Sequence, residues 1–335
     1  MNVAKLAAIG ICSLSLVGPG AAQAPGPGAA QAPDAAKFPS RPVKILVPFS
    51  PGGGIDILAR TTGQRLAEKW KVSVVVENRT GASGNIGTQA VAASTPDGYT
   101  LLMTASTIAM APSLFPNVRF DPNKDFAPIS EMAIGSLALV ATPSLPVKSF
   151  QDMVRLAKAN PGGINYSSPG IGTPHHLAME LVKQKAGIDM QHVPYKNSGG
   201  ALADLISGQV SVGFMPIHQV LQQAQDGQLR MLAAGGVRRS LVTPNTPSLA
   251  EASGLADIDV DMWYGVYAPA GTPTDVIDRI HRDMTDVLAM QEVRDTLERQ
   301  GLTAKTSSPA ELAQLTLRDF ERWHNVIKAA GIRAE

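Results

Sequence analysis

Residues 41–60 constrain the fold more than any other stretch, because they read as a buried strand, a glycine-rich turn and the start of a helix. The apolar run at 43–47 ends at Pro48, which is typical of a buried parallel strand. Three consecutive glycines follow at 52–54. From Ile55 to Trp70, apolar residues recur at steps of three and four, which predicts one buried stripe along a helix. The first amides of that helix should point out of the turn.

Such amides have no acceptor within the helix and carry a partial positive charge, so this turn is predicted to bind an anion. It is not a Walker loop, because no Gly-Lys-Ser/Thr follows, and its consecutive glycines do not fit GxGxxG. We therefore expect a small carboxylate rather than a nucleotide. The alternative is a glycine turn that only lets the chain pivot.

The first residues have the layout of a secretory signal peptide. Lys5 precedes an apolar segment at 6–17 that is too short to span a bilayer, and small residues follow. We assign 1–24 to the signal peptide and 25–37, rich in Ala, Pro and Gly, to a flexible tether. Cleavage after Ala22, Ala24 or Ala30 remains open. The predicted location is the periplasm.

The only cysteine, Cys12, lies inside this leader. It follows Ile11, where a lipoprotein site needs a small residue, so a lipid anchor is not expected. The mature chain then has no thiol for a disulfide or a metal.

Length and charge narrow the class of protein. The chain has 29 basic and 28 acidic residues, and loss of Lys5 with the leader balances them, which disfavours nucleic acid as a partner. Beyond the leader no apolar run is long enough for a membrane span. About 300 mature residues exceed what one core usually supports, so we expect two lobes.

Strand, turn and helix recur along the first part of the chain. A β-branched run at 72–76 precedes a glycine-containing turn and a helix at 88–93, and a strand at 99–103 precedes a polar turn with Ser106. Repeated units of this kind predict an α/β sheet with ligands at the carboxyl ends of its strands.

A strand at 134–141 is predicted to cross into a second lobe. There, a strand at 164–167 leads into the turn SSPGIGT, and Thr173 with Pro174 is a strong helix-start signal. The hydroxyls of Ser167, Ser168 and Thr173 could bond a carboxylate beside the exposed amides. Further strands are expected at 192–195, 210–215 and 229–234, with a helix at 201–207.

A strand at 258–268 should return the chain to the first lobe, and the helices after Pro273 should complete that lobe. We therefore place lobe I at 38–138 and 262–335, and lobe II at 139–261.

Several motifs together resemble the Bug family, the substrate-binding proteins of tripartite tricarboxylate transporters (TctC-like). They are PFSPGGGIDILAR, VVVENRTGASGNIG, TPDGYTLL, DFAPI, NYSSPGIGTPHHLA, VPYK, APAGTP and RWHNVIKAAGI, in order over nearly the whole mature chain. The resemblance implies a two-lobed periplasmic-binding-protein (Venus flytrap) fold, each lobe a sheet flanked by helices. It also implies a monomer without cofactor or catalysis, which captures a small organic acid and passes it to a membrane permease.

Carried over by position, the resemblance places the ligand between the lobes. The ligand-binding residues expected on this basis and from the glycine turns are Phe49, Ser50, Gly52, Gly53, Gly54, Ile55, Asp56, Asn85, Ser106, Ser167, Ser168, Gly170, Gly172, Thr173, His175, Lys196 and Asn197. No metal ligands are expected.

Three positions depart from the family pattern: Ile55, where Thr or Ser is frequent, Asn197, where Gly is frequent, and Ser211, where an acid is usual. The lost hydroxyl at Ile55 puts a polar ligand contact in doubt and favours a more apolar acid. Asp56 would compete with an anionic ligand for the same amides, so bracing of the turn is the preferred interpretation and ligand contact the alternative.

Adjacent His175 and His176 cannot both grip one ion, because neighbours on a helix diverge by about 100 degrees. We expect a solvated helix end, with a hydrogen bond from His175 to the ligand as the alternative. Lys196 is either a charge at the cleft rim or a solvated surface lysine.

Two rival functions remain open. A hydrolase using a turn serine is disfavoured, because GxSxG is absent and Ser50 is followed by proline. A periplasmic sensor that presents the bound acid to a signalling partner would look the same in sequence.

Overall fold

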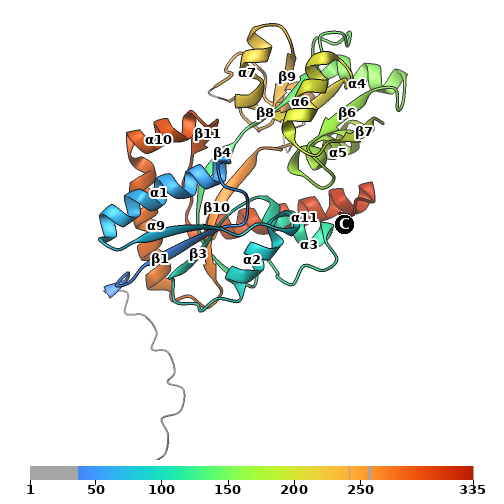
Figure 1. The fold of residues 1–335 in the computed structure, drawn as a ribbon. Coiled ribbons are helices and arrows are strands. Elements are labelled where there is room, and N and C mark those ends of the chain that lie inside the picture. Colours follow the sequence, from blue (N-terminus) through green and yellow to red (C-terminus); the bar gives the residue numbers. More distant parts are fainter. Residues whose placement is uncertain (1–36, 241, 256–257, 335) are drawn as a thin grey trace, which may run out of the picture. The chain divides into compact units, whose positions relative to one another are not determined.

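The computed structural model describes residues 37–240, 242–255 and 258–334, so the predicted signal peptide and nearly all of the tether lie outside the described residues. The described chain forms an α/β fold with two sheets flanked by helices, which confirms the predicted two-lobed fold class (Figure 1). Sheet A has the strand order β11-β4-β10-β3-β1-β2 and sheet B the order β7-β6-β8-β5-β9.

Sheet A gathers strands from both ends of the chain: β1 (Val43–Val47), β2 (Val74–Asn78), β3 (Thr100–Ala105), β4 (Phe126–Gly135), β10 (Met262–Pro269) and β11 (Leu302–Ala304). β1 pairs in parallel with β2 and β3, so these three strands end at one edge. One face carries α1 (Gly54–Trp70), α9 (Thr274–Ala289) and α10 (Gln291–Glu298). The other carries α2 (Asn85–Ala92), α3 (Thr107–Leu114) and the first part of α11 (Pro309–Ala330).

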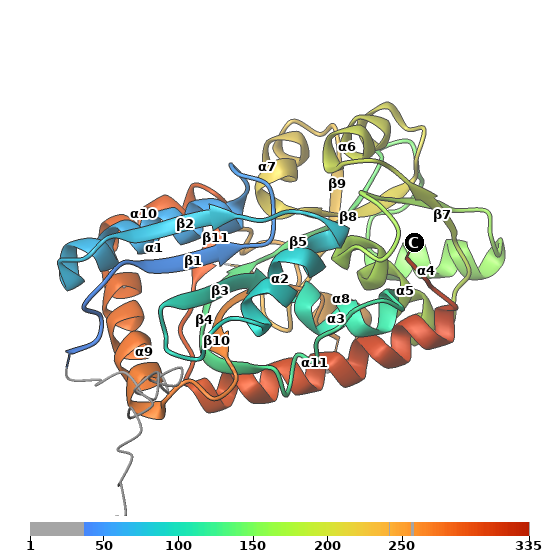
Figure 2. The ribbon, with the colours of Figure 1, turned by 60° about the horizontal axis from the view of Figure 1, so that its bottom comes forward.

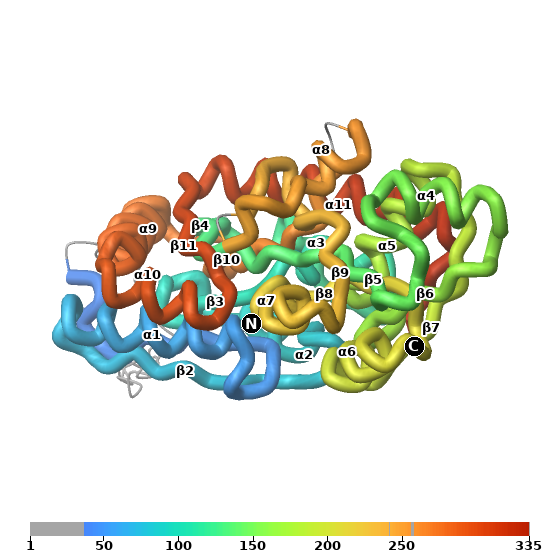
Figure 3. Tube along the Cα trace, turned by 90° about the horizontal axis from the view of Figure 1, so that it is seen from above, coloured from blue at the N-terminus to red at the C-terminus, as the bar shows by residue number. Residues whose placement is uncertain are grey.

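Sheet B contains β5 (Leu137–Ala141), β6 (Asn165–Ser168), β7 (Gln191–Pro194), β8 (Val212–Pro216) and β9 (Arg230–Ala234). β6 is parallel to β7 and β8, so these strands also share a carboxyl edge. One face packs against α4 (Phe150–Ala159), α5 (Pro174–Ala186) and α8 (Leu249–Ser253). The other packs against α6 (Ser198–Ser207) and α7 (Ile217–Gln225), which Figure 3 shows beside each other.

The predicted crossing strand at 134–141 is in fact two strands. β4 ends at Gly135, and after Ser136 the chain continues as β5 in the other sheet. The Asp261 carboxylate accepts hydrogen bonds from the Ser136 hydroxyl and the Leu137 amide, both at 3.1 Å. These bonds fix the point at which the chain passes from sheet A to sheet B. The predicted helices at 88–93 and 201–207 begin earlier, at Asn85 and Ser198. The exact lobe boundaries at 138 and 261 remain our proposal.

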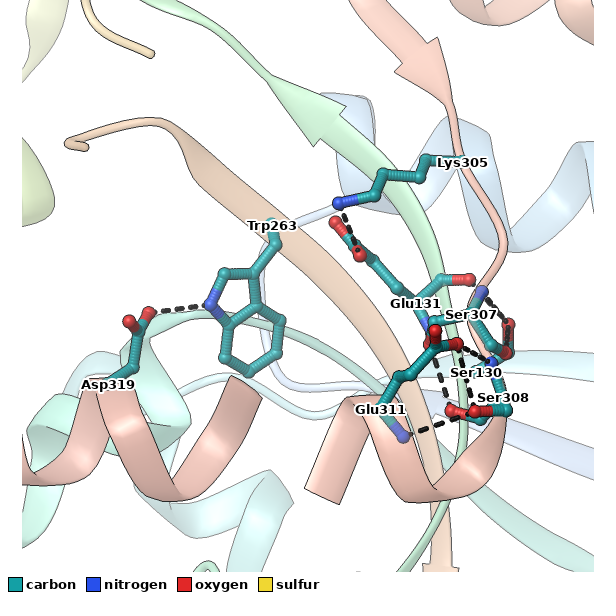
Figure 4. A network of polar contacts seen from close by, with 8 residues as sticks. All are labelled: Ser130, Glu131, Trp263, Lys305, Ser307, Ser308, Glu311 and Asp319. Atoms are coloured by element: carbon teal, nitrogen blue, oxygen red, sulfur yellow. Dashed lines mark hydrogen bonds and ion pairs between the residues drawn. The ribbon is translucent and has the colours of Figure 1, made fainter. Parts of the chain in front are cut away.

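The C-terminal helix α11 departs from the expectation that it only completes the first lobe. Its start is closed by a capping box between Ser308 and Glu311. The Ser307 amide donates to the Ser130 hydroxyl of β4 at 3.2 Å, and the indole of Trp263 in β10 donates to Asp319 at 2.7 Å, so this end of α11 is fixed to sheet A (Figure 4). Its later residues Trp323, Val326 and Ile327 instead join the apolar core of sheet B, and Figure 2 follows the helix to α5. α11 therefore contributes to both cores.

Candidate ligand-binding site

The first-lobe turn (residues 48–53) joins β1 to α1. Gly52 has φ +85°, a conformation that favours glycine, and Gly53 precedes α1 without a side-chain cap. In the part of the chain that the structure describes, the amide of Gly52 has a protein acceptor, whereas those of Gly53 and Gly54 have none. These two amides are free to meet an anion.

Asp56 braces this turn, the preferred of the two interpretations above. Its carboxylate accepts from the Gly52 amide at 2.9 Å, Arg60 Nε at 2.9 Å and Asn78 Nδ2 at 2.8 Å. Burial raises the pKa of Asp56, but the hydrogen bonds from Arg60, Gly52 and Asn78 outweigh it, and the pKa lies below its ordinary value. Asp56 is therefore ionised at neutral pH, and its charge is matched by Arg60.

Asn78, at the carboxyl end of β2, is a site residue that the sequence reasoning missed. Its amide also donates to the Phe49 carbonyl at 3.0 Å and its oxygen accepts from Arg60 at 2.8 Å. The Phe49 ring lies against Gly84, the residue before α2 and Asn85. The structure thus brings the Phe49–Asp56 and Asn85 regions together. The only available signal was an asparagine at a strand end.

The side chain of Ile55 does not point out of the turn. It is 6% exposed and belongs to the apolar core beneath sheet A, on the same stripe of α1 as Leu58 and Ala59. Only its backbone amide remains for a ligand, so its missing hydroxyl does not by itself make the ligand site more apolar. Ser50 is exposed.

Ser106 follows β3 at the same edge of sheet A. Its side chain is 2% exposed and its Oγ has no hydrogen-bond partner among the described residues. Its amide donates to the Trp263 carbonyl at 2.9 Å, which fixes the backbone. A buried hydroxyl without a partner is unusual in a native protein.

The second-lobe turn (residues 169–173) joins β6 to α5. Ser167 is fully buried, and its Oγ also lacks a partner in the described chain. Ser168 Oγ donates to the Gly170 carbonyl at 3.0 Å, and Thr173 Oγ1 donates to the same oxygen at 2.8 Å. Thr173 caps α5 as predicted, accepting from the His176 amide at 3.4 Å.

The prediction of a solvated helix end at the two histidines was wrong. His175 is 8% and His176 5% exposed, because α5 packs against β8 and α11. Both ring nitrogens of His175 lack a partner among the described residues, and burial lowers its pKa to about 4. It is therefore a neutral, unsatisfied imidazole at pH 7. His176 Nδ1, in contrast, accepts from the Gly172 amide at 3.0 Å.

Lys196 and Asn197 lie after β7 and are exposed. The Asn197 side chain accepts from the Gly200 amide at 3.0 Å and caps α6. An asparagine is a favourable N-cap, which gives this departure from the family pattern a structural reason. A Cβ on Gly170 would lie 3.7 Å from the Tyr195 carbonyl oxygen. The segment 195–197 therefore borders the second-lobe turn.

α3 links the two predicted halves of the site. A Cβ on Gly172 would meet Leu114 at 3.0 Å, and φ of Gly172 is +73°, so glycine is required there. Leu114 ends the helix that begins after Ser106. Eight residues at 1.5 Å rise give α3 a length of about 12 Å.

Two negative observations concern the described residues alone. No group of three or more His, Cys, Asp and Glu side chains among them is placed to hold a metal ion. None of their helices is both long and apolar enough to cross a membrane.

Comparison with known proteins identifies the family. Residues 58–332 match the family described as the tripartite tricarboxylate transporter family receptor. Protein BugT of Bordetella pertussis is 33% identical over 301 residues, covering 89% of this chain and 92% of BugT. A protein of Pseudomonas sp. from the tcbD-tcbE intergenic region is 34% identical, covering 87% and 86% of the two chains.

Solved structures agree with this assignment. An R. palustris protein solved with adipate is 32% identical with a TM-score of 0.74, covering 89% of this chain and all of that one. MatC from Rhodopseudomonas palustris, with bound malate, is 28% identical with a TM-score of 0.71, covering 87% and 100%. The chain therefore belongs to the tripartite tricarboxylate transporter receptor (Bug) family of periplasmic solute-binding proteins.

Proposed function

We propose that this protein captures a small carboxylate between its two lobes and delivers it to a membrane permease of the tripartite tricarboxylate type. It works as a monomer in the periplasm after export by the signal peptide at 1–24. Two solved relatives, one with adipate and one with bound malate, support the ligand class.

One observation carries the proposal: three buried polar side chains at the carboxyl edges of the two sheets have no partner within the described chain. They are the hydroxyls of Ser106 and Ser167 and the imidazole of His175, whereas the other unpartnered buried groups, on Thr243, His281, Thr285, Arg322 and Trp323, lie outside these edges. The large majority of buried side-chain polar atoms in native proteins are hydrogen-bonded, so the three at the edges are expected to find a ligand or ordered water.

The first-lobe turn supplies the favourable charge. The amides of Gly53 and Gly54 stand at the N-terminus of α1, a helix of 17 residues, whose dipole favours a carboxylate there. A hydrogen bond to a charged group contributes roughly 1.5–3 kcal/mol. Four or five such bonds reach the ~8 kcal/mol of a micromolar complex. A ligand bridging both turns would favour closure, because it binds the closed state more tightly.

We further propose that the protein does no chemistry on its ligand. In the described part of the chain, two serine–histidine pairs are in hydrogen-bond contact: Ser113 with His324 at 3.1 Å, on the exposed surface of α3 and α11, and Ser168 with His192 at 2.6 Å. Ser168 is fully buried and its hydroxyl donates to the Gly170 carbonyl. No carboxylate is recorded on His192 within the described residues, so the triad arrangement is not formed there.

A thermal-shift screen of mono-, di- and tricarboxylates, with aromatic acids and amino acids included, tests the ligand class. We expect one acid class, with adipate and malate as the first probes, to raise Tm and to bind in calorimetry with a micromolar Kd. If no acid shifts Tm or gives a binding isotherm, the proposed function is wrong.

The substitution Gly53→Asp tests the site itself. A Cβ at Gly53 would have only the Ser50 carbonyl nearby, at 3.9 Å, and φ is −78°, so the fold should tolerate the side chain. The added carboxylate would occupy the amides and repel an acid, abolishing binding. Ser73→Asp, on an exposed residue before β2, is the matched control. Retained affinity in Gly53→Asp would contradict the assignment.

Delivery is tested by uptake of the identified acid, labelled, in cells with and without the gene. Loss of uptake supports delivery to a permease. Normal uptake together with a lost transcriptional response would favour the sensor function instead.

A further inference from the structure

Three aromatic rings stack behind the second-lobe turn. The rings of His176 and His192 lie 3.8 Å apart between centroids and only 9° from parallel, and the Tyr166 ring stacks on His192 at 4.8 Å. These rings come from α5, β7 and β6, so the stack joins three consecutive elements. None of the three was expected to touch the ligand.

The two imidazoles hold the turn through separate hydrogen bonds. The Gly172 amide donates to His176 Nδ1 at 3.0 Å, so this nitrogen must be unprotonated and the proton resides on Nε2. His192 Nε2 lies 2.6 Å from Ser168 Oγ, whose hydrogen goes to the Gly170 carbonyl. With the single hydroxyl hydrogen committed, His192 Nε2 is the donor to Ser168.

We propose that His176 and His192 are positioning residues, which keep the second-lobe turn in its ligand-binding conformation through these two hydrogen bonds, and that the bond to His176 requires a neutral imidazole. The inference rests on the proposed function, because the turn is a predicted ligand contact. Neither imidazole needs to touch the ligand. They act through Gly172 and Ser168, next to the unpartnered Ser167 hydroxyl.

Protonation would undo this arrangement in a defined way. A proton on His176 Nδ1 replaces the acceptor by a donor that faces the Gly172 N–H. A second charge on His192 would then lie 3.8 Å from the first. Burial lowers the pKa of both imidazoles to about 4. The positive charge of Lys183 also lowers the pKa of His176, and the His176 ring also lowers the pKa of His192. The pair is thus neutral at pH 7 and charges only in acid.

The charged surroundings of the pair are nearly balanced. Glu180 and Lys183 of α5 form an ion pair at 2.7 Å, and the Tyr166 hydroxyl donates to Glu180. His175, the next residue on α5, is also neutral and buried. Because His175 titrates in the same pH range, substitutions at His176 and His192 are needed to assign a pH effect on the turn to these two residues.

The first test measures ligand-free protein by NMR, using imidazole nitrogen shifts and exchange of the Gly172 amide. We expect His176 with an unprotonated Nδ1, both rings titrating below pH 5, and a Gly172 amide that exchanges faster as they titrate. A protonated Nδ1 at pH 7.5, or exchange of Gly172 independent of the titration, would overturn the inference. This result does not depend on any ligand.

The second test measures affinity for malate or adipate, whichever the screen selects, at pH 7.5 and 4.5. His176→Leu removes the acceptor, and we expect Kd at pH 7.5 to rise about tenfold, equivalent to ~1.4 kcal/mol. His176→Asn keeps an acceptor near the position of Nδ1 and should stay within about threefold of wild type with a flatter pH profile. His192→Gln against His192→Leu should repeat this contrast. Asn325→Leu, on an exposed residue of α11, is the control.

An unchanged Kd in His176→Leu and His192→Leu, with normal urea unfolding curves, would overturn the positioning role. Equal losses in the Leu and the Asn or Gln variants would do the same, because they would point to ring packing rather than the hydrogen bonds. If wild type binds no acid at all, the proposed function fails, and the NMR titration still decides whether the pair holds the turn.

Discussion

Replacing His175 by leucine should make the protein more stable and a poorer binder. The imidazole is buried with neither nitrogen bonded to any described residue. An unsatisfied buried polar group costs about 1–3 kcal/mol, which an apolar side chain of similar size avoids. His175→Leu should therefore raise the free energy of unfolding by about that amount at pH 7.5. The same substitution removes a proposed ligand contact, so affinity for the acid should fall.

The stabilisation should grow in acid. Burial lowers the pKa of His175 from 6.5 to about 4. Between these values the unfolded chain binds a proton that the folded chain does not, so wild type loses stability as pH falls. With a pKa of about 4 in the folded chain and 6.5 in the unfolded chain, the free energy of unfolding of wild type falls by about 2–3 kcal/mol between pH 7.5 and 4.5 and by roughly 3 kcal/mol at pH 4. The leucine variant does not incur this loss.

Urea unfolding followed by circular dichroism at pH 7.5 and 4.5 measures both effects. The exposed Asn325→Leu, on α11, serves as the control and should show neither effect. A gap between His175→Leu and wild type that is the same at both pH values would refute the reasoning. Destabilisation of the variant would do so too, because it would mean that the imidazole is satisfied in the folded protein.

Three further predictions concern other parts of the site and the crossing between sheets. Thr173→Val should weaken ligand binding several-fold in calorimetry, and Thr296→Val, in α10, should not; equal constants would remove Thr173 from the site. Asp56→Asn should lower both stability and affinity at pH 7, with the stability difference fading only as pH falls below the ordinary carboxyl pKa of 3.8 and through the still lower pKa of folded Asp56. Burial, and after it the Asp259 carboxylate, raise the pKa of Asp261 to about 7, so wild type loses stability as pH rises from about 4 to 7. In urea unfolding, Asp261→Asn should therefore have a free energy of unfolding up to ~4 kcal/mol above wild type at pH 8, and one close to wild type at pH 4. A gain independent of pH would contradict this.

Local patterns were sufficient for the elements that carry the turns. The apolar run of β1 and the stripe beginning at Ile55 place the first-lobe turn at a strand-to-helix junction, and Thr173 with Pro174 places the start of α5. Both depend on signals within a few residues. The break between β4 and β5 was missed, because the single Gly135-Ser136 pair is the one interruption in an apolar run that reads as one continuous strand.

What could not be predicted depends on residues far apart in the chain. Asn78 reaches Asp56 across 22 positions, and no spacing rule links a strand end to the first turn of an earlier helix. His175 and His176 were misjudged for the same reason. Their place in the first turn of α5 suggests solvent, whereas α11, more than a hundred residues later, covers that helix. Burial by a distant segment leaves no local pattern.

The two turns of the proposed site offer an acid different chemistry, and this difference determines where pH is expected to act. In the first lobe the donors are backbone amides, and the nearby charge, Asp56 with Arg60, stays paired because the pKa of Asp56 is lowered and that of Arg60 is raised. In the second lobe the groups are hydroxyls and imidazoles whose usefulness depends on their being neutral. Between pH 7 and 5 neither turn changes its charge. Below pH 5 the second-lobe turn alone should lose its conformation before Asp56 is protonated, so release of the acid should begin from lobe II.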